Sequence, residues 1–175
     1  MRKPRIVVDG GRYHVVARAN RGEFMLESAE MKEEFVVVLE RAKRKFGFAV
    51  EMFCIMDNHI HLIIVVDRGE SLSRLMQWVL SVFAMRYNRI HRLKGHVWYD
   101  RFKSRVIGTL RQYLDTMEYV VRNPVKAGIV DSITQYGWTG LQWWRKAGQC
   151  LVEPPNALVR LRFRHLLPAV LTSQY

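Results

Sequence analysis

Cys54-Ile55-Met56-Asp57-Asn58-His59-Ile60-His61-Leu62-Ile63-Ile64-Val65-Val66 places two histidines around one isoleucine, directly before five aliphatic residues. The aliphatic part is typical of a β-strand that is buried on at least one face. Side chains on a strand alternate, so His59 and His61 point to one side and Ile60 to the other. Two imidazoles about 7 Å apart along a strand can bind one metal ion. Hydrogen-bonded histidines at the exposed end of a buried strand are the alternative.

The composition indicates one domain and a polyanionic partner. The chain has 175 residues, of which 49% are hydrophobic, enough to form a core without disulfides or metals. Its 28 Lys and Arg against 16 Asp and Glu give a formal net charge of +12. This excess favours nucleic acid over a membrane as partner, although basic composition alone does not establish it. We expect a domain at residues 1–148 and a basic and apolar tail of open role at residues 149–175.

Cysteine use and the N-terminus indicate the compartment. Cys54 and Cys150 lie far apart, so they fit neither a disulfide framework nor a zinc ribbon and indicate a reducing cytoplasm. The apolar run near the N-terminus is too short for a signal peptide. No segment approaches the length of a membrane span. We therefore expect a cytoplasmic protein with no membrane partner.

Caps, glycines and hydrophobic periodicity predict the order of the elements. Ser28 and Ser71 are expected to cap two helices, and Pro124 should end a third, since a residue before proline avoids the α region. The predicted elements are a strand at 12–19, a helix from 29 to about 46, strands at 48–55 and 59–66, a helix from 72 to about 94, an extended segment at 96–107 and a helix at 110–122.

This order predicts the fold. A β-α-β-β-α-β run with one further helix is typical of a ferredoxin-like α+β sandwich, an antiparallel sheet with helices on one face. In that fold the first and third strands lie side by side at the centre. The strand of His59 and His61 would therefore be central, with His14 a possible neighbour, and the added helix would carry Tyr119.

Two tyrosines lie on different sides of the helix predicted at 110–122. Tyr113 belongs to an apolar stripe centred near Met117, and we interpret it as core. Tyr119 lies about 160° from that centre, so it is either a surface residue or a functional one. Its face of the helix is otherwise polar, with Gln112, Asp115, Arg122 and, four residues on, Asn123.

The chemistry of Tyr119 suits the histidine pair. A tyrosine can attack phosphorus and form a covalent phosphotyrosine, and a divalent ion is needed to polarise the phosphate. His59 and His61 are candidate ligands for such an ion, and Asn123 can add a carbonyl oxygen. These donors suit Mn²⁺ or Mg²⁺ better than a structural zinc ion, which takes four protein ligands. From spacing alone, the combination is a hypothesis.

Several segments resemble, in the expected order, those of the single-tyrosine HUH transposases. Met56–Ile64 resembles the HUH segment of that family, and Glu118–Val130 resembles the segment that bears its tyrosine. Further matches are Gly11–Val15, Gly95–Lys103 and Tyr136–Thr139. The resemblance covers roughly residues 4–145. The closest resemblance is to the REP-associated tyrosine transposases, which act on repetitive extragenic palindromes in bacterial chromosomes.

The resemblance implies an enzyme that binds a hairpin in single-stranded DNA, cuts beside it and rejoins strands. The tyrosine becomes joined to the 5′-phosphate and leaves a free 3′-OH. Tyr119 matches the nucleophile, and His59 and His61 match the metal ligands for Mg²⁺ or Mn²⁺. Asn123 matches the third ligand position. The bacterial nucleoid would be the place of action. The basic residues expected to hold DNA are Arg86, Arg89, Arg101, Lys103, Arg105, Arg122 and Lys126.

Two positions depart from the family pattern, and the tail matches nothing familiar. Asp57 stands where many relatives carry proline, which should matter little in a turn. Val121 replaces a common histidine, so any role of that histidine is absent. In the tail, residues 159–164 alternate arginines with apolar residues, and strand and helix stay equally open.

Other functions remain open alternatives to the transposase. A binder of hairpin DNA on the same fold would not cut, but such a binder has no reason to keep Tyr119 together with the histidines. An RNA-binding protein is disfavoured because the central strand is aliphatic rather than aromatic. In a hydrolase that uses only water as nucleophile, Tyr119 would be dispensable. The sequence also leaves monomer and homodimer open.

Overall fold

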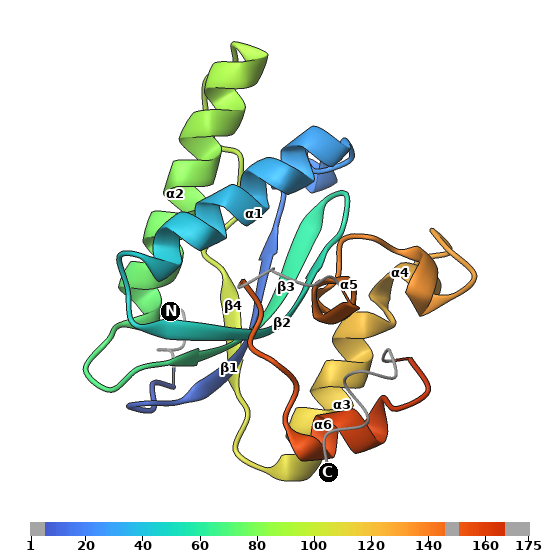
Figure 1. Cartoon of the computed structure of the whole chain (residues 1–175). Helices are drawn as coiled ribbons and strands as arrows, with labels where there is room; N and C mark the ends of the chain where they lie inside the picture. Colours follow the sequence, from blue (N-terminus) through green and yellow to red (C-terminus); the bar gives the residue numbers. More distant parts are fainter. Residues whose placement is uncertain (1–5, 146–150, 167–175) are drawn as a thin grey trace.

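A computed structural model describes residues 6–145 and 151–166 of the chain, which form an α+β sandwich (Figure 1). Its four strands make one antiparallel sheet in the order β2-β3-β1-β4. This order confirms the predicted ferredoxin-like arrangement, with the first and third strands at the centre. The strands are β1 (Arg12–Arg18), β2 (Phe48–Ile55), β3 (His59–Val66) and β4 (Lys103–Val106).

Two helices, α1 (Ala29–Lys43) and α2 (Leu72–His91), pack together on one face of the sheet (Figure 1). Both begin at the predicted caps. The hydroxyl of Ser28 accepts a hydrogen bond from the Met31 N–H, and that of Ser71 accepts one from the Arg74 N–H. Their fully buried residues form the main core with Val15, Ile60, Leu62 and Ile64 of the sheet, and they include Phe35, Leu39, Val79 and Phe83.

The opposite face of the sheet is covered by the C-terminal half of the chain (Figure 1). Helix α3 contacts β2 and β3, and α5 contacts β2. As a result β3 is buried on both faces, which explains its nearly continuous apolar sequence. The helices of this half are α3 (Leu110–Val121), α4 (Asn123–Lys126), α5 (Gly140–Arg145) and α6 (Ala157–Arg162), with short 3₁₀ turns η1 (Asn20–Gly22) and η2 (Ile133–Gln135).

The extended segment predicted at 96–107 is only partly a strand. Ladder pairing with β1 is limited to Lys103–Val106. Before it, Trp98 forms a single bridge with Ala19. The Trp98 indole N–H donates to the Leu80 carbonyl at 2.9 Å, and its ring packs against Phe83. The chain therefore contacts the end of β1 at Trp98 and pairs with β1 as a ladder again from Lys103.

The ends of two predicted elements also differ in detail. Helix α3 ends at Val121 as expected, but a further turn, α4, starts at Asn123 because proline is tolerated in a first helical turn. In the tail, where strand and helix were both open, Ala157–Arg162 form a helix, and Val159 and Phe163 are buried. The parts of the predicted tail at 149–150 and 167–175 lie outside the described residues.

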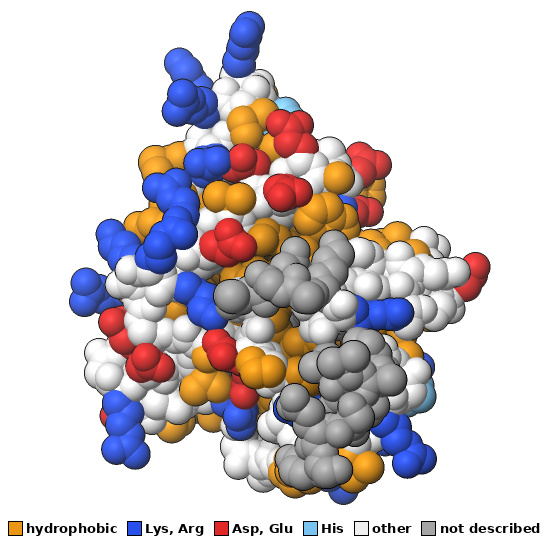
Figure 2. Space-filling model, in the orientation of Figure 1, with side chains coloured by type: hydrophobic (Ala, Val, Ile, Leu, Met, Phe, Trp, Pro, Cys, Tyr) orange, Lys and Arg blue, Asp and Glu red, His pale blue; other side chains and the backbone are white. Residues whose placement is uncertain are grey.

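Basic and acidic side chains are interspersed on the surface, with Lys and Arg denser along one edge of the view in Figure 2. Figure 2 shows Lys and Arg side chains along the edge beside α1 and α2, and Asp and Glu side chains toward the middle of the same view. Within residues 6–145 and 151–166, no helix is both long and apolar enough to cross a membrane.

Helix α5 approaches β2 so closely that Gly140 has no room for a side chain. A methyl group there would lie 2.9 Å from the Met52 sulfur and 3.1 Å from the Phe53 nitrogen. We expect Gly140→Ala to lower the free energy of unfolding by about 1–3 kcal/mol, the usual cost of overpacking. Urea denaturation of this variant and of Gly137→Ala provides the check. Gly137 has nothing within 4 Å of such a group, so an equal loss in both variants would contradict the tight packing of α5.

Candidate active site

Three imidazoles gather on the sheet face beneath α3. His59 and His61 project from β3 to this face, as the alternation predicts. The register pairs Val16 with His61, so His14, two residues before Val16 on β1, is the diagonal neighbour of His61. The His14 and His61 rings stack with centroids 5.1 Å apart, and the His59 and His61 rings meet edge to face at 5.0 Å. The predicted neighbour His14 is thus part of the cluster.

Hydrogen bonds fix the orientation of two of these rings. The Asn58 amide oxygen lies 2.7 Å from His59 Nδ1, so Nδ1 carries the proton and Nε2 keeps its lone pair. His61 Nδ1 lies 2.9 Å from His14 Nε2. His61 Nε2 is buried and has no hydrogen-bond partner in the described part of the chain. Metal-binding histidines commonly use one ring nitrogen while a neighbour holds the other, and this pair fits that pattern.

Burial keeps the three imidazoles neutral. It lowers the pKa of His14 to about 4, with a further contribution from Arg105. Burial, together with the other two histidines and Arg18, lowers the pKa of His61 to about 3. The pKa of His59 falls to about 4, again mainly through burial. Neutral imidazole is the form that binds a metal, so no proton has to leave these rings at pH 7.

Tyr119 of α3 stands over this cluster. Its ring centroid lies 5.5 Å from that of His61 and 5.9 Å from that of His14, both edge to face. The side chain is 41% exposed, so a molecule from solvent can reach it. The Lys126 ammonium lies 4.9 Å from the ring centroid. The tyrosine that the helical wheel places away from the core therefore meets the histidine pair on the sheet.

Helix α3 is held in place from two sides. On the sheet side, the Arg12 guanidinium forms two hydrogen bonds with Glu51 and lies 4.3 Å from the centroid of the buried Tyr113 ring. On the other side, Glu118 forms ion pairs with Arg162 of α6 and with Arg122. The hydrogen bond from Arg162 holds the pKa of Glu118 below its usual range. The Arg12 contact with Tyr113 and the ion pairs of Glu118 thus fix the helix that carries Tyr119.

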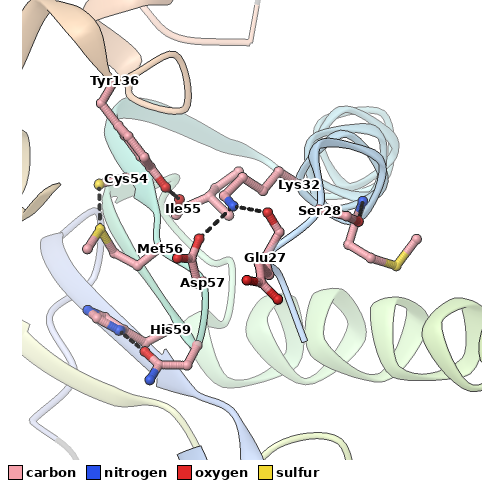
Figure 3. Close-up of polar contacts among 11 residues, drawn as sticks. Glu27, Ser28, Lys32, Cys54, Ile55, Met56, Asp57, His59 and Tyr136 are labelled. Atoms are coloured by element: carbon pink, nitrogen blue, oxygen red, sulfur yellow. Dashed lines mark hydrogen bonds and ion pairs between the residues drawn. The ribbon is translucent and has the colours of Figure 1, made fainter. Parts of the chain in front are cut away.

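The turn before His59 is fixed by a buried lysine. The Lys32 ammonium on α1 donates to Asp57 at 2.7 Å and to the Glu27 carbonyl at 2.8 Å (Figure 3). Its side chain is only 4% exposed. Across the turn, the buried Tyr136 hydroxyl donates to the Ile55 carbonyl at 2.7 Å (Figure 3). Both ends of the turn are therefore anchored by residues remote in sequence.

Sequence reasoning assigned no role to Lys32 in this turn, although a sign of its burial was present. Lys32 lies three, four and seven residues before Phe35, Val36 and Leu39, so it falls in the apolar stripe of α1. A lysine in such a stripe needs a buried partner. The identity of that partner, Asp57, could not be read from the periodicity.

Asn123 lies next to the site but makes a local contact. Its Nδ2 donates to the Tyr119 carbonyl at 2.9 Å, which leaves the Oδ1 oxygen for another partner. Among the described residues, no contact joins Asn123 to either histidine. Nor does that part of the chain contain three or more His, Cys, Asp or Glu side chains grouped to hold a metal. Two histidines fit as ligands, and any further oxygen ligands would come from Asn123, water or substrate.

Of the seven predicted DNA-binding residues, three lie beside Tyr119. Lys103 and Arg105 on β4 pair with Val16 and His14, so they project to the face of the histidines. They line a groove of about 530 Å³ that reaches Tyr119. Lys126 is the third.

The other four predicted DNA-binding residues lie elsewhere. Arg86 forms an ion pair with Glu34 between α2 and α1, and Arg122 is paired with Glu118. Arg89 is exposed near the end of α2, and Arg101 lines a second groove beside Trp98. DNA contact by all seven residues stays a prediction.

Comparisons with known proteins agree with this fold. The family model described as "Transposase IS200 like" matches residues 7–123, more than half of the chain. No curated protein sequence matches the chain significantly. A solved REP-associated tyrosine transposase, described as bound to a REP hairpin, matches with a TM-score of 0.71 at 19% identity. That match covers 82% of this chain and 84% of the other.

A second solved structure is similar over the core. This candidate transposase from Deinococcus radiodurans R1 matches with a TM-score of 0.50 at 14% identity. The match covers 69% of this chain and 95% of the other. Identities at this level show a shared fold. Both structures therefore support the predicted architecture.

Lys32→Met should destabilise the protein by about 3 kcal/mol, because it leaves the Asp57 carboxylate in the turn without its partner. Urea denaturation measures the loss. Arg41→Met on the same helix is the matched control, since Arg41 is exposed and its replacement should cost less than about 0.5 kcal/mol. A similar small loss in both variants would show that the buried pair does not fix the turn.

Without metal, the stability of the protein should fall as the pH drops from about 6.5 to about 4. In this window the unfolded chain takes up protons, while the folded chain keeps its three buried histidines neutral. His61→Gln should reduce the dependence of unfolding free energy on pH, measured by urea denaturation in the presence of chelator. Ile63→Val, a destabilised variant on the same strand and face, should keep the wild-type dependence. An unchanged dependence in His61→Gln would contradict burial of a neutral His61.

Proposed function

Since the chain belongs to the family of IS200-like transposases, we propose that it is an endonuclease and strand transferase for single-stranded DNA, with Tyr119 as nucleophile. The observation that carries the proposal is the position of the Tyr119 ring, 5.5 Å from His61 of the neutral histidine pair. A half-exposed tyrosine over buried ligand-type nitrogens suits attack on a phosphate brought in from solvent.

The proposed cleavage exchanges one phosphate ester for another. The Tyr119 oxygen forms a bond to phosphorus as the bond from phosphorus to the 3′ oxygen breaks. The phenolic proton leaves the tyrosine, and the departing 3′ oxygen takes up a proton to give a free 3′-OH. The 5′-phosphate stays joined to Tyr119. Because the number of ester bonds is unchanged, the reverse reaction rejoins a strand without a separate energy source.

The residues around Tyr119 have distinct proposed roles. His59 and His61 would hold a divalent ion, Mg²⁺ or Mn²⁺, through their Nε2 atoms, with Asn123 as a further ligand. Such an ion stabilises the charge that develops on the phosphate. Lys126, whose ammonium lies beside the Tyr119 ring, would contact the negative phosphate at the cut.

Hairpin-bearing single-stranded DNA is the proposed substrate. The REP-associated relative of the same fold is described as bound to a REP hairpin, and the net charge of +12 favours a polyanion. Lys103 and Arg105 would hold the backbone next to the cut, and repetitive extragenic palindromes are the expected targets. One chain carries Tyr119 and both histidines together, which supports a site completed within a single chain.

Tyr119→Phe tests the nucleophile directly. Hairpin oligonucleotides from the genome that encodes the protein, labelled at the 5′ or 3′ end, are incubated with Mg²⁺, Mn²⁺ or chelator and run on a denaturing gel. Wild type should give a metal-dependent DNA species joined to the protein through the 5′-phosphate. Tyr119→Phe should reduce cleavage by at least about 10³-fold, since the nucleophile is lost. Tyr99→Phe, at another exposed tyrosine, is the matched control.

Two results would contradict this mechanism. If Tyr119→Phe cuts as well as wild type, a water molecule is the nucleophile and the tyrosine assignment is wrong. If wild type binds the hairpins tightly under all metal conditions but never cuts them, the protein is a binder of hairpin DNA on a transposase fold.

A further inference from the structure

The groove that reaches Tyr119 has two walls of different chemistry. One wall is the edge strand β4, which contributes Lys103 and Arg105. The other wall is the polar face of α3, which contributes Gln112, Asp115 and Thr116 in addition to Tyr119. The volume of about 530 Å³ is in the range of sites for a ligand the size of one nucleotide. The basic wall suits a phosphate, and the polar wall remains without a role in the cleavage proposed above.

Hydrogen bonds define what the α3 wall offers to a ligand. The Gln112 side-chain oxygen accepts from the Gly108 N–H at 3.0 Å, so its NH₂ group is the part left to donate. The Thr116 hydroxyl donates to the Gln112 carbonyl at 2.6 Å. Asp115 lies one helical turn from Gln112 and 3.8 Å from Arg111, too far for a hydrogen bond. Its carboxylate oxygens can therefore accept.

We propose that this groove is a nucleobase subsite that reads the unpaired base next to the cleaved phosphate. The proposal rests on the function proposed above and adds a specificity determinant to it. Lys103 and Arg105 hold the backbone of the bound nucleotide. Gln112 donates to a ring or carbonyl acceptor of the base, and Asp115 accepts from an amino group beside it. Guanine, which offers an N1–H in addition to its amino group for the carboxylate to accept from, is therefore preferred over thymine, whose N3–H is its single donor.

The position of the subsite explains why it would select a base rather than only a backbone. Phosphate contacts fix the register of a strand but carry no sequence information, whereas an amide and a carboxylate one turn apart recognise a base edge. Tyr119 lines the same groove, so a nucleotide bound there lies directly beside the nucleophile. Recognition of that base would thus select which phosphate Tyr119 attacks.

Binding measurements in a non-cutting background test the subsite. Tyr119→Phe protein is titrated into fluorescein-labelled hairpin oligonucleotides with a single-stranded flank, and each flank nucleotide is made abasic in turn. Where the abasic change weakens binding, the four bases are compared by fluorescence polarisation. We expect guanine to bind roughly tenfold more tightly than thymine, about the effect of one base-edge contact.

Removal of the acceptor should abolish this preference. With Asp115→Ala added, the preference should fall below about twofold, whereas Gln112→Ala should weaken the binding of both bases. Asp131→Ala removes an exposed carboxylate elsewhere and is the matched control for charge. Because the readout is a ratio between bases, a general gain in affinity from lost negative charge cancels. Asp131→Ala should keep the full preference.

Two outcomes separate failure of the subsite from failure of the proposed function. If hairpins bind but Asp115→Ala keeps the full base preference, or no flank position shows one, the groove is not a base subsite. The proposed function would then stand unchanged. If the protein binds the hairpins no better than an unrelated single strand, the hairpin substrate itself is wrong, and the subsite is overturned with it.

Discussion

Burial of β3 on both faces is the constraint on which the other features depend. The strand lies between β1 and β2, with α1 and α2 on one side and α3 and α5 on the other. Alternation sends Ile60, Leu62 and Ile64 into the core beneath α1 and α2. The same alternation sends His59 and His61 to the opposite face, under the tyrosine helix. A shift of register by one residue would exchange the two sets, so core packing also fixes the histidines.

The candidate site separates buried ligand-type groups from an exposed tyrosine, the proposed nucleophile. Burial makes it costly to protonate His61, and so it keeps the nitrogens ready for a cation. Tyr119 is instead 41% exposed, where a DNA strand can reach it. The groove of Lys103 and Arg105 continues from the tyrosine toward the edge of the sheet. This arrangement gives the candidate metal ligands rigidity and leaves the proposed nucleophile accessible.

Much of the positive charge serves the structure rather than a partner. Lys32 is buried against Asp57, and Arg86 is paired with Glu34 between two helices. Arg12 links the sheet to α3. A net charge of +12 therefore indicates a polyanionic partner but does not say which cations contact it. Lys103 and Arg105, which line the groove at Tyr119, are the better candidates for contact with that partner, because they lie beside the candidate site.

The sequence alone determined which face of a strand or helix a side chain lies on, because that depends on a repeat of two to four residues. Strand alternation placed His59 and His61 on one face, and helical periodicity placed Tyr119 away from the core. The element order predicted the sheet order because few connections satisfy it. Only the tertiary structure brought Tyr119 to His61, stacked His14 on the pair, and joined Lys32 to Asp57. These contacts join residues far apart in the chain, and their partners are chosen by packing between elements, which no local pattern encodes.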